Sequence, residues 1–232
     1  MKKLIIAIFI IQTMMIGIWG LTSSGVSTAE AIKVDKETGL LIKQDTPENL
    51  VSSYYELLGL KQYEKVRALM TPASQKVVDA KSMADIIKRT KMQDAAIEKV
   101  FPAAVNSDLA VVGYVRSATI TNKVFMVGLA ITKVGENRWE KVEVTDELDI
   151  NQVENVLKLA VQVETEMLEE ESNGYGINGI TPEYQEMITN QLRSMQAAHQ
   201  QSLLQLQEYK KQQNQAPQAA PENSNTEPAP KK

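Results

Sequence analysis

The chain contains 232 residues, no cysteine, and a formal net charge of −4 at pH 7. This length accommodates one domain with an appendage. The lack of cysteine excludes disulfide bonds and a lipid attached to a signal-peptide cysteine. Because no basic patch stands out, we expect no nucleic-acid partner.

The first 31 residues have the pattern of a signal peptide. Two lysines precede an apolar run at 4–21, and Ala29 and Ala31 satisfy the small-x-small pattern of a cleavage site. Removing residues 1–31 takes away two of 25 basic and one of 29 acidic side chains, which leaves 23 and 28. We expect export, to the medium or the cell envelope, with cleavage after either alanine. The alternative is an uncleaved membrane anchor, because a run of about 18 apolar residues approaches the length that spans a bilayer.

A group of short helices is predicted next. Residues 32–45 are interpreted as a linker or a leading strand. Thr46-Pro47-Glu48 is a helix start, because threonine can cap the free N–H groups, proline fits the first position, and glutamate complements the helix dipole. Apolar residues at helical spacing continue this helix to Gly59. Further helices are predicted at 63–70, 71–80 and, more weakly, 82–92.

A run of strands follows the helices. The strands are predicted at 95–105, 109–121, 124–134 and 138–145. Pro102 places an edge or a bulge in the first of them, and 124–134 is apolar on both faces, which indicates a central strand. Short turns between strands predict an antiparallel meander with helices packed on one face. The predicted unit is an α+β domain at 46–148.

Four segments of this domain carry a resemblance to a known family. They are Thr46-Pro47-Glu48, Tyr54-Tyr55-Glu56-Leu57-Leu58, Gln62-Tyr63-Glu64-Lys65-Val66 and Gly135-Glu136-Asn137-Arg138-Trp139-Glu140-Lys141-Val142. In this order they resemble the nuclear transport factor 2-like superfamily, most of all its small extracytoplasmic bacterial members. The resemblance implies a cone fold, in which a curved antiparallel sheet wraps around helices and leaves a cavity at its wide end. Some members are isomerases or dehydratases, and many are binding or assembly modules, so the fold does not choose between them.

Five polar residues are the candidates for the cavity of such a cone. They are Tyr54, Tyr55, Asp94, Tyr114 and Arg116. They would bind a small apolar ligand, and an isomerase-like enzyme would need an aspartate base with a tyrosine donor among them. The alternative is that the tyrosines pack in the core with Arg116 at its rim. No nucleophile motif or phosphate-binding glycine loop is present, so we assign no catalytic residue and no cofactor.

A two-helix arm is predicted at 149–213. Its first helix runs from Asp149 to about Glu171, glycines near 174–179 break it, and the second helix starts at Thr181. The apolar stripe of the second helix is interpreted as a seam for a protein partner or for self-association, formed by Ile188, Leu192, Met195, His199, Leu203 and Leu206. The arm could fold back as a hairpin, dock on the domain, or pair with a second copy. We expect substitutions at Leu192 and Leu203 to affect association rather than stability.

The remaining features assign no metal. His199 is the single histidine, so we expect a structural or partner-contact role, or else pH sensing, rather than a metal site. The glutamates between 164 and 171 are interpreted as a solvated helix face rather than a calcium site. Residues 214–232 are polar and rich in proline, which predicts a disordered tail.

These features together predict a role class. We expect an exported, non-catalytic binding or assembly module of the bacterial cell envelope. The alternatives are a membrane-anchored assembly subunit of a secretion or conjugation channel, and a cavity enzyme acting on a hydrophobic small molecule.

Overall fold

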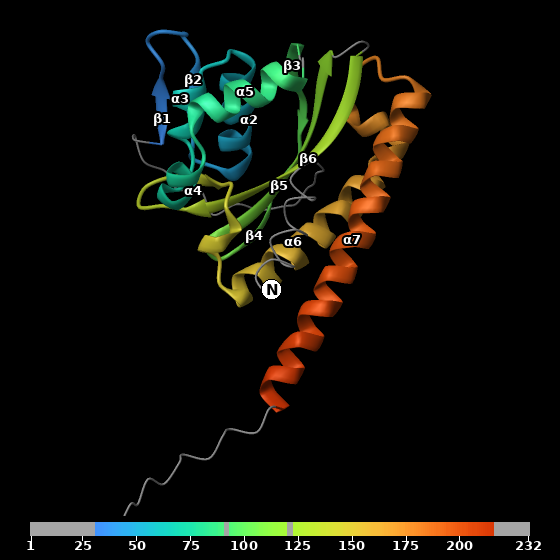
Figure 1. Cartoon of the computed structure of the whole chain (residues 1–232). Coiled ribbons are helices and arrows are strands. Elements are labelled where there is room, and N and C mark those ends of the chain that lie inside the picture. Colours follow the sequence, from blue (N-terminus) through green and yellow to red (C-terminus); the bar gives the residue numbers. More distant parts are fainter. Residues whose placement is uncertain (1–30, 91–92, 120–122, 216–232) are drawn as a thin grey trace, which may run out of the picture.

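The computed structural model describes residues 31–90, 93–119 and 123–215 (Figure 1). The predicted signal peptide, apart from Ala31, and the predicted tail beyond residue 215 lie outside these ranges. The strands are β1 (Ile32–Val34), β2 (Leu41–Lys43), β3 (Gln93–Val100), β4 (Ala104–Asn106), β5 (Leu109–Thr119), β6 (Lys123–Val134) and β7 (Trp139–Val142). The α-helices are α2 (Pro47–Gly59), α3 (Tyr63–Arg67), α4 (Pro72–Val77), α5 (Ala80–Thr90), α6 (Ile150–Glu169) and α7 (Pro182–Gln215). No helix within the described ranges is long and apolar enough to cross a membrane.

The centre of the molecule is an antiparallel sheet with the order β3-β5-β6-β7, in which β4 also pairs with β5. The α+β fold class and the central position of β6 are confirmed. The strand predicted at 95–105 is divided into β3 and β4, and the interruption contains Pro102, as expected for a residue that cannot donate to a ladder. The β5–β6 ladder is the longest, and it runs from Leu109 paired with Lys133 to Thr119 paired with Lys123.

The N-terminal elements cover one face of this sheet. Thr46 caps α2 by accepting a hydrogen bond from the backbone N–H of Asn49, and Pro47 takes the first helical position, as predicted. Glu48 reaches further, since its carboxylate accepts the N–H of Ala103 at 2.7 Å. The leading segment is a β1–β2 hairpin, whose Ile42 enters the core between α2 and the sheet.

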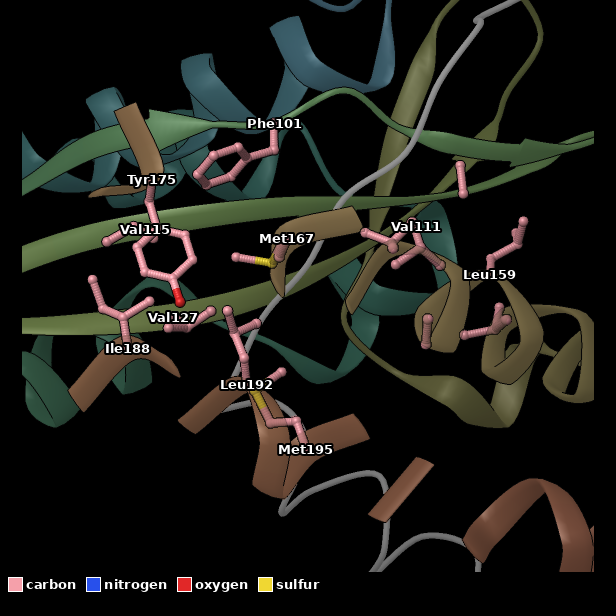
Figure 2. Packing of buried hydrophobic residues seen from close by; sticks show 14 of the residues in the cluster. Phe101, Val111, Val115, Val127, Leu159, Met167, Tyr175, Ile188, Leu192 and Met195 are labelled. Atoms are coloured by element: carbon pink, nitrogen blue, oxygen red, sulfur yellow. The ribbon is translucent and has the colours of Figure 1, made fainter. Parts of the chain in front are cut away.

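The C-terminal helices cover the opposite face, as Figure 1 shows. The helices of the predicted domain do lie on one face, and the predicted arm covers the second face, because α6 packs on β4 and β5, and α7 packs on α6 and β6. Figure 2 shows the resulting core, in which Val115 and Val127 of the sheet meet Met167 of α6 and Ile188 and Leu192 of α7. Of the three predicted arrangements of these helices, the hairpin and docking on the domain both occur.

Side chains of α7 also cover an edge of the sheet. Within the described residues, β7 pairs with β6 only at Ile131–Val134, so the rest of β6 has β5 as its single strand partner. There the side-chain oxygen of Gln191 accepts the N–H of Val127 at 3.3 Å, and the Tyr184 hydroxyl donates to the carbonyl of Lys123 at 2.7 Å. Because unpaired edges are templates for association, these contacts protect β6.

Candidate ligand-binding site

Four of the five predicted cavity residues meet between α2 and the sheet. The Tyr54 hydroxyl donates to Oε1 of Glu143 at 2.7 Å, and the Tyr55 hydroxyl donates to that of Tyr114. The rings of Tyr55 and Tyr114 have centroids 4.3 Å apart, and the guanidinium carbon of Arg116 lies 5.7 Å from the Tyr55 ring. Asp94 belongs to β3, but its side chain lies outside the described part of the structure.

Tyr54 and Tyr114 belong to the core between α2 and the sheet, and Tyr55 packs against that core. Tyr54 and Tyr114 are buried, and burial raises the pKa of both phenols, with the Glu143 carboxylate adding to the effect at Tyr54. A phenol with a raised pKa stays protonated and acts as a hydrogen-bond donor. The arrangement is that of packed, mutually bonded tyrosines with Arg116 beside them.

A cavity lies instead at the end of β7, where the sheet is incomplete. It has a volume of about 110 Å³. Its aliphatic wall comes from the sheet and α6, and includes Val111, Leu129, Ile131, Val153, Val156 and Ala160. Its polar lining is formed by Tyr55, Lys141, Glu143, Thr145 and His199. The cavity thus reaches from the tyrosine cluster, around the end of β7, to the space between the sheet and the helix pair.

The chain leaves β6 after Val142 because a serine captures its next backbone donors. Oγ of Ser74, which is fully buried in α4, accepts the N–H of Glu143 at 2.9 Å and that of Val144 at 3.2 Å. The same hydroxyl donates to Oε1 of Glu147, which also accepts the hydroxyl of Thr71 at 2.6 Å. The N–H groups of Trp139 and Lys141 point away from β6, so by alternation along the strand the N–H of Val144 is the one that would otherwise be available to extend the ladder with β6. The α4 N-terminus therefore ends β7 and opens the cavity.

Replacing Ser74 with alanine is expected to destabilise the protein by about 2 kcal/mol, because it removes a fully buried hydroxyl that accepts the N–H groups of Glu143 and Val144. Ser82→Ala is the matched control, since that hydroxyl is exposed and bonds the nearby Asp79 side chain. Urea denaturation of both variants measures the difference. Equal midpoints for Ser74→Ala and Ser82→Ala would contradict the account of how β7 ends.

The far wall of the cavity holds a buried acid–histidine pair. Nδ1 of His199 on α7 lies 2.7 Å from Oε1 of Glu164 on α6, and the two side chains are 4% and 0% exposed. The second carboxylate oxygen, Oε2 of Glu164, is enclosed without a hydrogen-bond partner among the described residues. The interpretation of this glutamate as part of a solvated face is wrong. The sequence did contain a signal, because Glu164 lies four residues after Ala160 and three before Met167, on the stripe that α6 buries.

Burial raises the pKa of the Glu164 carboxyl above its usual 4.5, and the hydrogen bond from His199 only partly opposes this effect. A raised folded-state pKa gives stability that is present below the unfolded value and lost as pH rises through the folded value. The free energy of unfolding should therefore fall with rising pH relative to Glu164→Gln, which cannot ionise. Denaturant unfolding of both proteins, at steps of about 0.5 pH unit between pH 4 and pH 8, measures this difference in the free energy of unfolding. Glu169→Gln, at an exposed position of α6, should instead parallel the wild type, and parallel curves for Glu164→Gln would contradict the expectation.

The predicted partner seam on α7 lies largely inside the chain. Ile188, Leu192, Met195 and His199 are almost fully buried, Leu206 is nearly so, and Leu203 is partly exposed. At the other end of the helix pair, Nζ of Lys210 donates to the Asn151 side chain at 2.7 Å and also bonds Glu154. The stripe therefore has intramolecular partners, and its use by another chain stays a prediction that requires the helices to separate.

Comparison with known proteins gives a limited result. No family model and no curated protein matches the chain. Among solved structures, it is similar to a SEC-C motif containing protein from Psychrobacter arcticus, with 20% identity over 60% of this chain and 84% of that one, at a TM-score of 0.39. It is also similar to a SEC-C motif containing protein from Rhodopseudomonas palustris, with 13% identity over 42% of this chain and 75% of that one, at a TM-score of 0.35.

Metal binding has no obvious site in the part of the chain that the structure describes, where no group of three or more His, Cys, Asp or Glu side chains is placed to hold an ion.

Proposed function

We propose that the protein is an exported, non-catalytic binding module of the bacterial cell envelope, and that its ligand occupies the cavity at the end of β7. The observation that carries this proposal is the cavity itself, an aliphatic space with a few polar groups at its ends. This combination is typical of small-molecule sites. In this proposal the role of the tyrosine cluster is structural, because it closes the cone around α2.

The volume limits the size of the ligand. Drug-sized ligands occupy pockets of roughly 300–1,000 Å³, whereas an aliphatic and aromatic cavity of about 150 Å³ is enough for benzene. At about 110 Å³, the cavity fits a ligand no larger than a small ring or a short branched chain. Such a ligand gains affinity mainly by removing its apolar surface from water.

The non-catalytic assignment is supported by how the polar groups are used. Oε1 of Glu143 accepts hydrogen bonds from both Tyr54 and Lys141, and the Tyr55 hydroxyl is committed to Tyr114. A general base or nucleophile needs a free reacting atom within hydrogen-bond reach of the substrate. Because these side chains are hydrogen-bonded to one another, we assign them to the wall of the cavity rather than to catalysis.

Dissolved xenon is a neutral apolar probe that tests whether the cavity accepts a ligand. We expect saturable shifts of the methyl NMR signals of Leu129, Ile131 and Val153, and loss of those shifts in Ala160→Leu, which fills the space. Ala197→Leu, the same substitution at an exposed position of α7, should keep them. Absence of xenon-dependent shifts in the wild type would overturn the proposal.

The fold family is part of the same proposal. We infer that the domain is a cone of the nuclear transport factor 2-like superfamily, in its small extracytoplasmic form. The order of helices α2–α5 followed by the antiparallel strands supports this, as does the packing of α2 on one face of the sheet. The cavity at the end of β7 would then be a feature of this chain, lying partly on the face opposite α2.

Export can be tested through the cleavage site. Ala31 is only 2% exposed, and its carbonyl accepts the N–H of Gln44 at 2.6 Å, so the folded domain uses this residue. We propose cleavage after Ala29, which leaves Ala31 in the mature chain. Intact-mass measurement of the exported protein should find Glu30 at the N-terminus. A start at Ile32 would contradict this choice of site, and retention of residues 1–29 in the membrane fraction would favour the anchored alternative.

One observation favours a membrane-anchored assembly subunit as the second candidate. Ile32, Val34 and Leu41 share one face of the β1–β2 hairpin, and all three are exposed in the first element of the described structure after the apolar run at 4–21. An apolar face at this position would suit a domain held close to a membrane. The membrane-fraction measurement above separates the two candidates.

A further inference from the structure

His199 lines the cavity, and one of its two ring nitrogens is engaged with Glu164. Nδ1 is the ring nitrogen that has a hydrogen-bond partner among the described residues. In the same part of the chain, Trp139 Nε1 and Glu164 Oε2 are the side-chain atoms enclosed without a partner, and Nε2 of His199 is not one of them. Because Nδ1 is engaged with Glu164 and this buried ring lines the cavity, Nε2 is the ring nitrogen available to a ligand there.

The net charge of the Glu164–His199 pair determines whether Nε2 donates or accepts a hydrogen bond. An uncompensated charge in this enclosed position is costly, so the pair is favoured in states with no net charge. One such state is a protonated Glu164 that donates to Nδ1 of a neutral imidazole, and the other is a carboxylate beside an imidazolium. In both states Nε2 carries a proton, because the first requires the Nε2–H tautomer and the second protonates both nitrogens. Nε2–H is thus a hydrogen-bond donor.

Two other polar groups that line the cavity have partners of their own. Nζ of Lys141 bonds Glu143, and the Tyr55 hydroxyl donates to Tyr114. The cavity then combines an aliphatic wall with a donor at the end formed by α6 and α7. A ligand that lacks an acceptor would leave that donor unpaired when it displaces water, which weakens binding.

We propose that the cavity selects small apolar molecules that carry a neutral hydrogen-bond acceptor, such as a carbonyl oxygen, and that Nε2–H of His199 binds this oxygen. This inference rests on the proposed function and names its ligand class. Glu164 is a positioning residue in it, since it holds the ring through Nδ1 and keeps the proton on Nε2.

Three five-membered rings of similar shape test the selection. Cyclopentanone has an acceptor oxygen, cyclopentane has none, and cyclopentylamine is a cation at neutral pH. Each is titrated into the protein as the cell exports it, with methyl NMR signals of the cavity reporting affinity and the imidazole signals reporting contact. Because the chain has a single histidine, the imidazole signals need no further assignment.

We expect cyclopentanone to bind about tenfold more tightly than cyclopentane, as one net hydrogen bond provides, and to shift the His199 Nε2–H proton signal. In the double variant His199→Leu with Glu164→Leu, both members of the pair are replaced by aliphatic side chains, which avoids an orphaned charge. That variant should lose the preference for cyclopentanone over cyclopentane, because the ketone oxygen no longer finds a donor in the cavity. The imidazole measurement on the wild type stands even if the variant fails to fold.

The outcomes separate this inference from the proposed function. Equal binding of cyclopentanone and cyclopentane, or tighter binding of cyclopentylamine, would overturn the acceptor selection and leave the cavity as an apolar site. Binding of none of the rings, together with no response to xenon, would overturn both.

Discussion

Replacing Leu192 with glutamate is expected to destabilise the protein by more than about 4 kcal/mol and to unfold it in mild denaturant. The side chain is 0% exposed and lies in the core between α7, α6 and the sheet (Figure 2). Removing a buried leucine costs roughly 2–5 kcal/mol before the penalty for burying a carboxylate is added. Because the stability of a domain is only about 5–15 kcal/mol, little of it would remain. Circular dichroism during urea titration measures the loss.

The control for this change lies on the same helix. Leu204 is 62% exposed, so Leu204→Glu makes the same chemical change without entering the core and should alter stability by about 0.5 kcal/mol or less. The sequence-based expectation was that Leu192 affects association and not stability, and its burial reverses that expectation. A Leu192→Glu protein that melts like the wild type would mean that α7 is not part of the core.

Replacing Gly128 with alanine is expected to destabilise the protein by about 3 kcal/mol. Gly128 pairs with Tyr114 across the β5–β6 ladder, and the Tyr114 ring lies over it. A Cβ atom at Gly128 would be 1.7 Å from Cζ of Tyr114, so the ring must leave its place against Tyr55. Overpacking a buried site in this way typically costs 1–3 kcal/mol (about 3 for a displaced ring). Equilibrium unfolding in guanidinium chloride measures the change.

A double-mutant cycle identifies the cause of that loss. Once Tyr114→Ala has removed the ring, Gly128→Ala should cost close to nothing, which gives a coupling energy of about 3 kcal/mol between the two positions. The same variants can be examined for xenon binding, because Tyr55 lines the cavity and loses its partner when Tyr114 moves. Additive effects of the two substitutions would show that the glycine is needed for another reason.

The two faces of the sheet differ in what they contribute: one carries the tyrosine cluster, and the other carries most of the cavity wall. On the α2 face, Tyr54 bonds Glu143 and Tyr55 bonds Tyr114, so these side chains pack together between α2 and the sheet. On the opposite face, α6 and α7 bring a donor and an aliphatic wall to the place where β7 stops. The helices that we expected to form an arm therefore supply one wall of the candidate site.

Much of the fold could be predicted because its signals are local. The alternation along β5 placed Ala110, Val112 and Tyr114 on one face and Val111 and Val115 on the other, and these groups belong to the two separate cores. Helix starts at Thr46 and Thr71 were also readable, since the capping threonine and the following proline are adjacent in the chain. Signals of this kind depend on residues within a few positions of one another.

The partners that lie far apart in the chain were not readable. Ser74 bonds the backbone of Glu143 and Val144, about seventy residues away, and Glu164 meets His199 across the α6–α7 pair. The residues that flank Ser74 and Glu164 in the sequence form no pattern that predicts which distant residue each will bond. An apolar stripe on α7 fits a core and an external seam equally well, because periodicity shows that a face is buried without showing what buries it.

The sequence by itself determined the α+β class, the order of helices and strands, the central place of β6 and the amphipathic character of the last two helices, since each follows from spacing along the chain. Only the tertiary structure decided that those helices cover the second face of the sheet, that Ser74 ends β7 early, and that a buried acid–histidine pair borders the resulting cavity. These features depend on which surfaces meet when the chain is compact, and burial and hydrogen bonding between distant residues select among surfaces that local spacing leaves equivalent.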